Sequence, residues 1–153
     1  TMEREKKEGR YSRIHQQLKV LLEKPGDLNA RLSTVAAVLH HKMDYFFWTG
    51  FYLLHEGELT VRTYQGPVAC QVLEKGRGVC WAAILRGESI VVEDVHLFPG
   101  HIACDSRSRS EIAVPLRNNN GEITGILDID SKELASFDET DRKWLERIIE
   151  LVR

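Results

Sequence analysis

The feature that most constrains the fold is a turn-forming run, Asn-Asn-Asn-Gly at positions 118–121, between two segments rich in β-branched residues. Asn and Gly accept the left-handed backbone that tight hairpin turns require. We therefore predict an antiparallel hairpin with strands at 110–117 and 122–131. Segments 48–54 and 59–64, on either side of His-Glu-Gly-Glu, predict a second hairpin nearer the N-terminus.

Helical periodicity is found at both ends of the chain. Apolar residues recur at helical spacing over 11–24 and again over 28–41, with Pro25-Gly26 between the two runs and Asp27 as a predicted N-cap. A third such run begins at a cap, Ser136 or Asp138, and has an apolar face of Trp144, Leu145, Ile148, Ile149 and Val152. A short helix is expected at 79–86 and a strand at 89–92. Residues 70–78 and 93–110 read as irregular chain.

These elements predict an α+β fold, with an antiparallel sheet and the N- and C-terminal helices packed on one face. The 153 residues suit a single domain, 3–153, whose N-terminal helices occupy 3–43 and whose sheet, loops and last helix occupy 46–153.

The charges nearly cancel, 21 Lys+Arg against 23 Asp+Glu, which disfavours nucleic-acid and membrane partners. The charged start lacks the apolar region of a signal peptide, so we expect a cytoplasmic protein.

The second hairpin carries three carboxylates on one face. A turn centred on Asn119-Asn120 pairs Glu111 with Asp128, whereas one centred on Asn120-Gly121 pairs Glu111 with Asp130. Both registers place all three acids on one face and an apolar set on the other. A solvated charged face would be the simplest reading. Like charges on paired strands are unfavourable, however, so the cluster suggests a bound cation or shared protons with a raised pKa.

The three cysteines, Cys70, Cys80 and Cys104, cannot form a closed disulfide framework. Buried thiols are one interpretation, and a metal site or redox chemistry is another. Cys70 and Cys80 follow turn-forming sequence, and Cys104 lies in the irregular segment 93–110, where functional residues are often found. Trp48 and Tyr52 share one side of their strand and would wall a small pocket for a sulfur-bearing ligand if that side faces the acids.

A set of motifs resembles one known family. The motifs are Trp48-x-Gly50-Phe51-Tyr52, Gly66-Pro67-x-Ala69-Cys70, Gly76-Arg77-Gly78-Val79-Cys80, Phe98-Pro99-Gly100-His101-Ile102-Ala103-Cys104-Asp105, Ser110-Glu111-Ile112 and Leu127-Asp128-Ile129-Asp130-Ser131. In these motifs and in the spacing of its cysteines the chain resembles the free methionine-R-sulfoxide reductases, which have a GAF fold. It departs from them at Trp81, where the family usually has a small residue after the cysteine.

The resemblance implies a role for each site residue. Cys104 would be the nucleophile, Cys70 the principal resolving cysteine and Cys80 an accessory thiol. The three acids, Glu111, Asp128 and Asp130, would bind the amino group and the sulfoxide oxygen of the substrate, and Trp48 and Tyr52 would shape the pocket around its methyl group.

The expected reaction is reduction of free L-methionine-(R)-sulfoxide through a cysteine sulfenic acid and an intramolecular disulfide, with thioredoxin as reductant. It requires no metal and no cofactor. His101, Arg107 and Arg109 flank Cys104 and are candidates to favour its thiolate. An amide replaces the α-ammonium in peptide-bound methionine, so buried acids would select the free amino acid. GAF relatives often dimerise, and a homodimer is expected.

Two other interpretations remain open. His101, Cys104, Cys70 and Cys80 supply four possible zinc ligands, although they lack the paired Cys-x-x-Cys spacing of structural zinc sites. Alternatively, the chain is a non-enzymatic GAF sensor that binds a small ligand or reports redox state through its thiols. The fold alone does not separate a sensor from a reductase.

Overall fold

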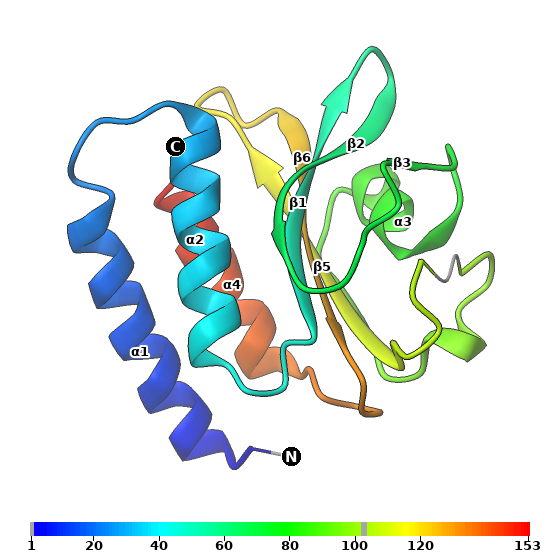
Figure 1. The fold of residues 1–153 in the computed structure, drawn as a ribbon, viewed down its shortest axis with the longest axis horizontal. Helices are drawn as coiled ribbons and strands as arrows, with labels where there is room; N and C mark the ends of the chain where they lie inside the picture. Colours follow the sequence, from blue (N-terminus) through cyan, green and yellow to red (C-terminus); the bar gives the residue numbers. More distant parts are fainter. Residues whose placement is uncertain (1, 102–103) are drawn as a thin grey trace.

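The computed structural model describes residues 2–101 and 104–153 and has an open antiparallel sheet at its centre (Figure 1). Within the described residues the sheet has six strands in the order β3-β2-β1-β6-β5-β4. Their bounds are Trp48–His55 for β1, Glu58–Gln65 for β2, Val72–Leu73 for β3, Ile90–Val92 for β4, Ser110–Arg117 for β5 and Ile123–Ser131 for β6. Both predicted hairpins are confirmed. Strand β3, a two-residue edge strand, falls in a segment predicted to be irregular.

Three helices form a layer on one face of the sheet. They are α1 (Arg4–Leu21), α2 (Leu28–Lys42) and α4 (Glu139–Glu150), and α1 packs across α2 and α4 (Figure 1). Their apolar faces share one core with the inward side chains of β1, β5 and β6, including Phe51, Ile112 and Leu127. The predicted α+β fold, with N- and C-terminal helices on one face, is confirmed. None of the described helices combines the length and apolarity needed to cross a membrane.

The helix ends follow local chemistry. The Asp27 carboxylate accepts a hydrogen bond from the Ala30 N–H at 2.8 Å, and Gly87 ends helix α3 (Gly78–Arg86) in a left-handed conformation with φ of 69°. Of the two predicted caps for α4, Asp138 is the N-cap and forms a capping box with Asp141. Helix α1 begins at Arg4, seven residues before the predicted start.

The other face of the sheet carries a smaller layer. Helix α3 (Gly78–Arg86) and the 3-10 turn η1 (Val95–Leu97) lie here, and a second core joins α3 to β1, β4, β5 and β6 through residues such as Trp48, Val79, Val92 and Ile126. Figure 1 shows α3 and the loop that follows β4 on the side opposite α2 and α4. This arrangement brings the cysteine-bearing segments to the same face as the acidic residues.

The pairing of β5 with β6 decides the register. Glu111 lies opposite Asp130, and Ala113 lies opposite Asp128. The pairing of Glu111 with Asp128, the alternative register, is therefore wrong. The register shifts between the Leu116–Gly125 and Arg117–Ile123 pairs, where Thr124 is an extra residue on β6, and the turn contains Gly121 with φ of 80°. All three acids still share one face, as predicted from either register.

Candidate functional site

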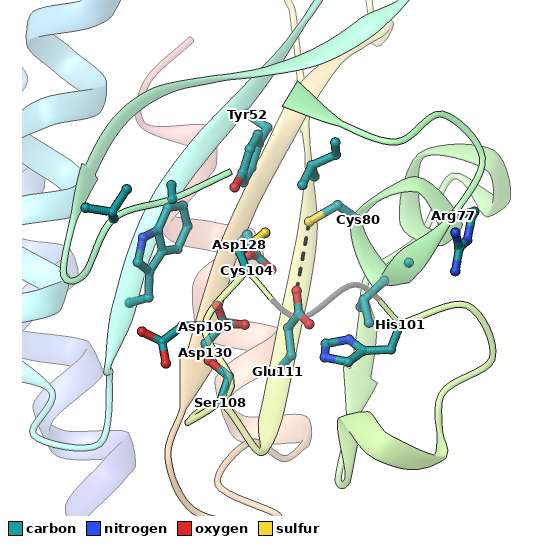
Figure 2. Close-up of a pocket in the computed structure, with 16 residues that line it drawn as sticks. Tyr52, Arg77, Cys80, His101, Cys104, Asp105, Ser108, Glu111, Asp128 and Asp130 are labelled. Atoms are coloured by element: carbon teal, nitrogen blue, oxygen red, sulfur yellow. Dashed lines mark hydrogen bonds between the residues drawn. The ribbon is translucent and has the colours of Figure 1, made fainter. Parts of the chain in front are cut away.

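A small cavity lies between the acid-bearing strands, α3 and the loop after η1. Seven of the eight sequence-predicted site residues line it: Trp48, Tyr52, Cys80, Cys104, Glu111, Asp128 and Asp130. Figure 2 shows the labelled side chains among them converging from β1, β5, β6, α3 and the Cys104 loop: Tyr52, Glu111, Asp128, Asp130, Cys80 and Cys104. The eighth, Cys70, is covalently bonded to Cys104. The volume of the cavity is about 50 Å³. Pockets for drug-sized ligands have volumes of about 300–1,000 Å³, so this site suits a small ligand.

The three acids line the cavity from two neighbouring strands, β5 and β6, and β6 lies between β1 and β5 in the sheet. Asp128 lies opposite Gly50, and Asp130 lies opposite Trp48 on β1 and Glu111 on β5. Glu111 and Asp128 are buried, and Asp130 is half-buried. The Asp128 Oδ1 atom has no hydrogen-bond partner among the described residues. A buried polar atom without a partner is costly, which points to a ligand that completes the site.

Electrostatics keep protons on this cluster. Burial raises the pKa of Glu111 well above its usual value, and the nearby Asp128 and Asp130 carboxylates raise it further. Burial likewise raises the pKa of Asp128, and burial and then Asp128 raise the pKa of Asp130. The cluster can therefore donate a proton and, in its ionised members, hold a cationic group.

Cys80 lies in the first turn of α3 and faces the acids. Its Sγ donates a hydrogen bond to Glu111 Oε2 at 3.9 Å (Figure 2). Burial raises the pKa of this thiol well above its usual value, and the Asp128 and Glu111 carboxylates add to the effect. Trp81, the departure from the family pattern, packs in the second core, and its indole N–H donates to the Leu73 carbonyl at 3.5 Å. The bulk of Trp81 thus lies toward β3.

Cys70 and Cys104 form a disulfide with a Cα–Cα separation of 5.5 Å. Cys104 is exposed at the cavity, in contrast to the buried Cys80. The Tyr52 hydroxyl donates to the Cys70 carbonyl at 3.3 Å, which joins the Cys70 segment to β1. Two members of the Cys104 motif, Ile102 and Ala103, lie outside the described residues.

Two aromatic rings form one wall of the cavity. Trp48 and Tyr52 stack with centroids 5.8 Å apart, and Trp48 stacks on Tyr64 at 5.2 Å. Gly50 makes this possible because a Cβ there would lie 2.6 Å from the Trp48 ring and would also collide with Tyr64. Tyr64 was not predicted. Its contact depends on the register of the β1–β2 hairpin, which places Tyr64 opposite Gly50.

The basic residues near Cys104 differ in their contacts. Arg107 binds the Asp105 carboxylate at 2.7 and 2.9 Å and lies over the Phe47 ring, so it is engaged away from the sulfur. Hydrogen bonds from Arg107 lower the pKa of Asp105 to about 2. Arg109 is exposed, whereas His101 lines the cavity and has a pKa lowered by burial and then by His96.

The structure adds cavity residues that sequence reasoning did not select. Arg77, the N-cap of α3, lines the cavity and pairs with Glu74 at 2.8 Å, and Ser108 and Asp105 contribute from the Cys104 loop. The Gly76-Arg77-Gly78 motif was a signal for Arg77, since both glycines have positive φ and shape the entry to α3.

The metal-ligating groups of the cavity differ from the zinc set considered above. The disulfide takes two of those four ligands, Cys70 and Cys104. Among the described residues, the group with metal-binding spacing is Cys80, Glu111 and Asp128, whose ligand atoms lie within 4.8 Å of one another.

Comparisons with known proteins find chains similar to this one. The GAF domain family matches residues 27–153. GAF domain-containing protein A of Dictyostelium discoideum is 46% identical over 147 residues, covering 95% of this chain and 92% of that protein. Free methionine-R-sulfoxide reductase of Escherichia coli is 37% identical, covering 91% and 84% respectively. The X-ray structure of free methionine-R-sulfoxide reductase from Neisseria meningitidis in complex with its substrate is 42% identical and superposes with a TM-score of 0.88, covering 93% and 85%.

Proposed function

The chain belongs to the free methionine-R-sulfoxide reductase family of GAF domains, and we propose that it reduces free L-methionine-(R)-sulfoxide to L-methionine. One observation carries the proposal: a disulfide-forming cysteine pair and a trio of acids, the buried Glu111 and Asp128 with the half-buried Asp130, meet at one small cavity. The cysteine pair supplies two electrons. The acids supply protons and a counter-charge for the substrate ammonium.

Substrate recognition is argued from the three acids of the cavity, which have no basic partner among the described residues. Among the described residues, Glu111, Asp128 and Asp130 form no ion pair with a basic side chain, and Asp128 Oδ1 has no hydrogen-bond partner. An α-ammonium would provide both the charge and the donors. A peptide-bound methionine sulfoxide has an amide at that position and would leave the acids unpaired. The stacked Trp48 and Tyr52 rings would hold the methyl-sulfur end.

The chemical step joins the nucleophile and the acids. The Cys104 thiolate attacks the sulfoxide sulfur while the oxygen takes a proton from the acid cluster. A second proton lets the oxygen leave as water while the new S–S bond joins Cys104 to the substrate sulfur. Water then attacks the Cys104 sulfur, the S–S bond breaks with its electron pair going to methionine, and one proton returns to the acid cluster, which leaves Cys104 sulfenic acid. The exposed Cys104 suits the nucleophile better than Cys80, because burial raises the pKa of the Cys80 thiol and keeps it protonated.

Resolution uses the neighbouring thiol. The Cys70 thiol attacks the sulfenic sulfur, releases water and forms the disulfide with Cys104. The 5.5 Å separation of their Cα atoms supports this pairing. An external dithiol, for which we propose thioredoxin, then reduces the disulfide at its exposed Cys104. Cys80 is proposed as an accessory thiol in this exchange. A homodimer and a cytoplasmic location stay predictions.

We also propose that residues 3–153 form one domain. The GAF match begins at residue 27, but α1 shares a core with α2 and α4 through Tyr11, Ile14 and Leu18. This shared core supports including 3–43 in the same unit as 46–153.

Single-turnover chemistry tests the cysteine roles. Fully reduced Cys104→Ser and Cys70→Ser proteins are mixed with excess free methionine-R-sulfoxide in the absence of reductant, and methionine is quantified. We expect no methionine from Cys104→Ser and one equivalent per chain from Cys70→Ser, with a trappable sulfenic acid. Thermal unfolding checks that both variants are folded. Equal yields from the two variants would remove the nucleophile assignment, and a folded wild type that releases no methionine would leave the sensor interpretation.

A further inference from the structure

Cys80, Glu111 and Asp128 form a compact donor set at the inner end of the cavity. One sulfur and two carboxylates reach this point from α3, β5 and β6, and the three ligand atoms lie within 4.8 Å of one another. All three residues are buried, with 4–6% of each exposed. Figure 2 shows Cys80 and Glu111 pointing toward each other across the site.

The set lacks a positive charge of its own. Among the described residues, no Lys, Arg or His forms an ion pair with Glu111 or Asp128, and the buried Asp128 Oδ1 has no hydrogen-bond partner. A cation bound between these groups would neutralise the carboxylates and satisfy that oxygen. The missing hydrogen-bond partner of Asp128 Oδ1 is independent of the spacing between the three ligand atoms, and it also points to a ligand at this position.

The donor types favour a thiophilic divalent cation of the zinc class. Zinc is bound by Cys sulfur at about 2.3 Å and by carboxylate oxygen at about 2.0–2.2 Å, so sulfur and oxygen on one tetrahedral ion lie about 3.6 Å apart. The 3.9 Å between Cys80 Sγ and Glu111 Oε2 is already close to this spacing. Mg²⁺ and Ca²⁺ require more oxygen ligands and disfavour thiolate.

We propose that Cys80, Glu111 and Asp128 bind a zinc-class divalent cation, which competes with the amino-acid ligand of the cavity. Binding forms a metal–sulfur bond and releases the Cys80 thiol proton to solvent, with no change of oxidation state. The ion takes the two carboxylates that would otherwise face the substrate ammonium. It acts as a reversible inhibitor and is not a cofactor. The competition rests on the proposed function, whereas the metal binding does not.

The binding test uses the protein with the Cys70–Cys104 disulfide intact, so that Cys80 is the one free thiol in the chain. Co²⁺ is titrated as a spectroscopic probe and then displaced with Zn²⁺. We expect one Co²⁺ per chain, with the charge-transfer absorption of a thiolate ligand. Cys80→Ser should abolish that absorption, and Asp128→Asn should retain it but weaken binding by at least about 10–100-fold, the range for disturbed metal sites.

Matched controls keep the outcome specific. Asp105→Asn removes a carboxylate from the same cavity but outside the donor set, and we expect unchanged Co²⁺ affinity. Excess Mg²⁺ should not displace Co²⁺. Absence of Co²⁺ binding, or binding with no thiolate absorption and no effect of Cys80→Ser, would overturn the site. Neither failure bears on sulfoxide reduction, because this titration involves no turnover.

Competition is measured separately on the same disulfide form. Free methionine, the product, should displace Co²⁺ from the protein, whereas alanine, which chelates cobalt similarly but lacks the thioether, should not. Co²⁺ absorption that is equally insensitive to both amino acids would overturn the competition and leave the metal site in place. Cobalt binding by a protein that reduces no sulfoxide would instead contradict the proposed function and the competition that rests on it, and would leave the metal site in place.

Discussion

Two polar clusters that contain buried acids lie in different layers of this molecule, and they differ in how the acids are paired. In the helical layer, Asp141 accepts hydrogen bonds from Lys7 Nζ at 2.7 Å, Tyr11 Oη at 2.6 Å and Tyr45 Oη at 2.5 Å. On the other side of the sheet, Glu111, Asp128 and Asp130 lie together, and within the described chain no basic side chain pairs with them. The first cluster is complete within the chain, and the second requires a ligand.

The pKa directions express the same difference. Burial raises the pKa of Asp141, but hydrogen bonds from Lys7, Tyr11 and Tyr45 oppose the shift. Burial also raises the pKa of Glu111, and there the neighbouring Asp128 and Asp130 add to it. A buried acid surrounded by donors contributes to folding, whereas acids that repel one another are retained at a cost to stability. We infer that the first cluster is structural and the second functional.

The largest expected effect is on catalysis, at Asp128. We expect Asp128→Asn to lower kcat/KM for free methionine-R-sulfoxide by about 10²–10⁴-fold, the range for loss of an acid–base group. The free energy of unfolding should stay within about 1 kcal/mol of wild type, because Asp128 Oδ1 has no hydrogen-bond partner and no basic side chain of the described residues pairs with this carboxyl group. Coupled kinetics and urea unfolding measure the two quantities. A large loss of stability with normal activity would reverse the assignment of the two clusters.

The helical cluster should show the opposite pattern. Asp141→Asn leaves the buried Lys7 without its closest partner, and we expect the free energy of unfolding to fall by about 3–5 kcal/mol. Activity per folded molecule should be unchanged, because Asp141 lies outside the cavity. Urea unfolding followed by fluorescence gives the stability. A variant as stable as wild type would show that the Lys7–Asp141 pair contributes little.

The pH dependence of stability tests the raised pKa values of the acid trio. Raised pKa values for Glu111, Asp128 and Asp130 mean that the folded state keeps protons that the unfolded chain has released. The free energy of unfolding therefore falls as pH rises from the ordinary carboxyl pKa through the raised values, by up to about 1.4 kcal/mol per pH unit for each proton. We expect Asp128→Asn to flatten this slope in urea unfolding with EDTA from about pH 5 to about pH 8.

Asp105→Asn is the control for that slope. The pKa of Asp105 is lowered to about 2, so its contribution is present above the unfolded pKa and is lost only in acid. Its removal should leave the slope between about pH 5 and about pH 8 unchanged. If the free energy of unfolding of the wild type rises with pH between about pH 5 and about pH 8, the pKa values of the trio are not raised by folding.

The smallest effects are expected from a matched pair of tyrosines. Tyr45→Phe removes a hydrogen bond to the Asp141 carboxylate and should cost about 1.5–3 kcal/mol of stability, since bonds to charged groups are stronger. Tyr52→Phe removes a longer bond to the neutral Cys70 carbonyl and should cost about 0.5–1.5 kcal/mol. Thermal unfolding of both variants measures the difference. Equal losses of stability would contradict the claim that the hydrogen bond to the Asp141 carboxylate is the stronger of the two.

Much of this layout was predictable because it depends on local patterns. Strand periodicity places Glu111, Asp128 and Asp130 on one face in either register, so the acidic face did not depend on the uncertain turn. Gly87 and Asp27 mark helix ends by local backbone and hydrogen-bond chemistry.

The features that were not predicted depend on tertiary contacts. The first turns of α1 carry no apolar periodicity, and Lys7 becomes a buried residue only because α4 brings Asp141 to it. Strand β3 has two residues and exists through pairing with β2. The approach of Cys80 to Glu111 requires α3 to pack on β5, and the pairing of Cys70 with Cys104 was implied by the family resemblance alone.

The most direct measurement compares four substrates in a thioredoxin-coupled assay that follows NADPH consumption: the R and S epimers of methionine sulfoxide, each free and peptide-bound. Because no basic side chain in the described part of the chain pairs with the three acids, turnover should require the free ammonium. We predict NADPH consumption with the free R epimer and none above background with the other three. Equal rates on free and peptide-bound R epimer would contradict the account, because they would show that the three carboxylates do not recognise the substrate ammonium.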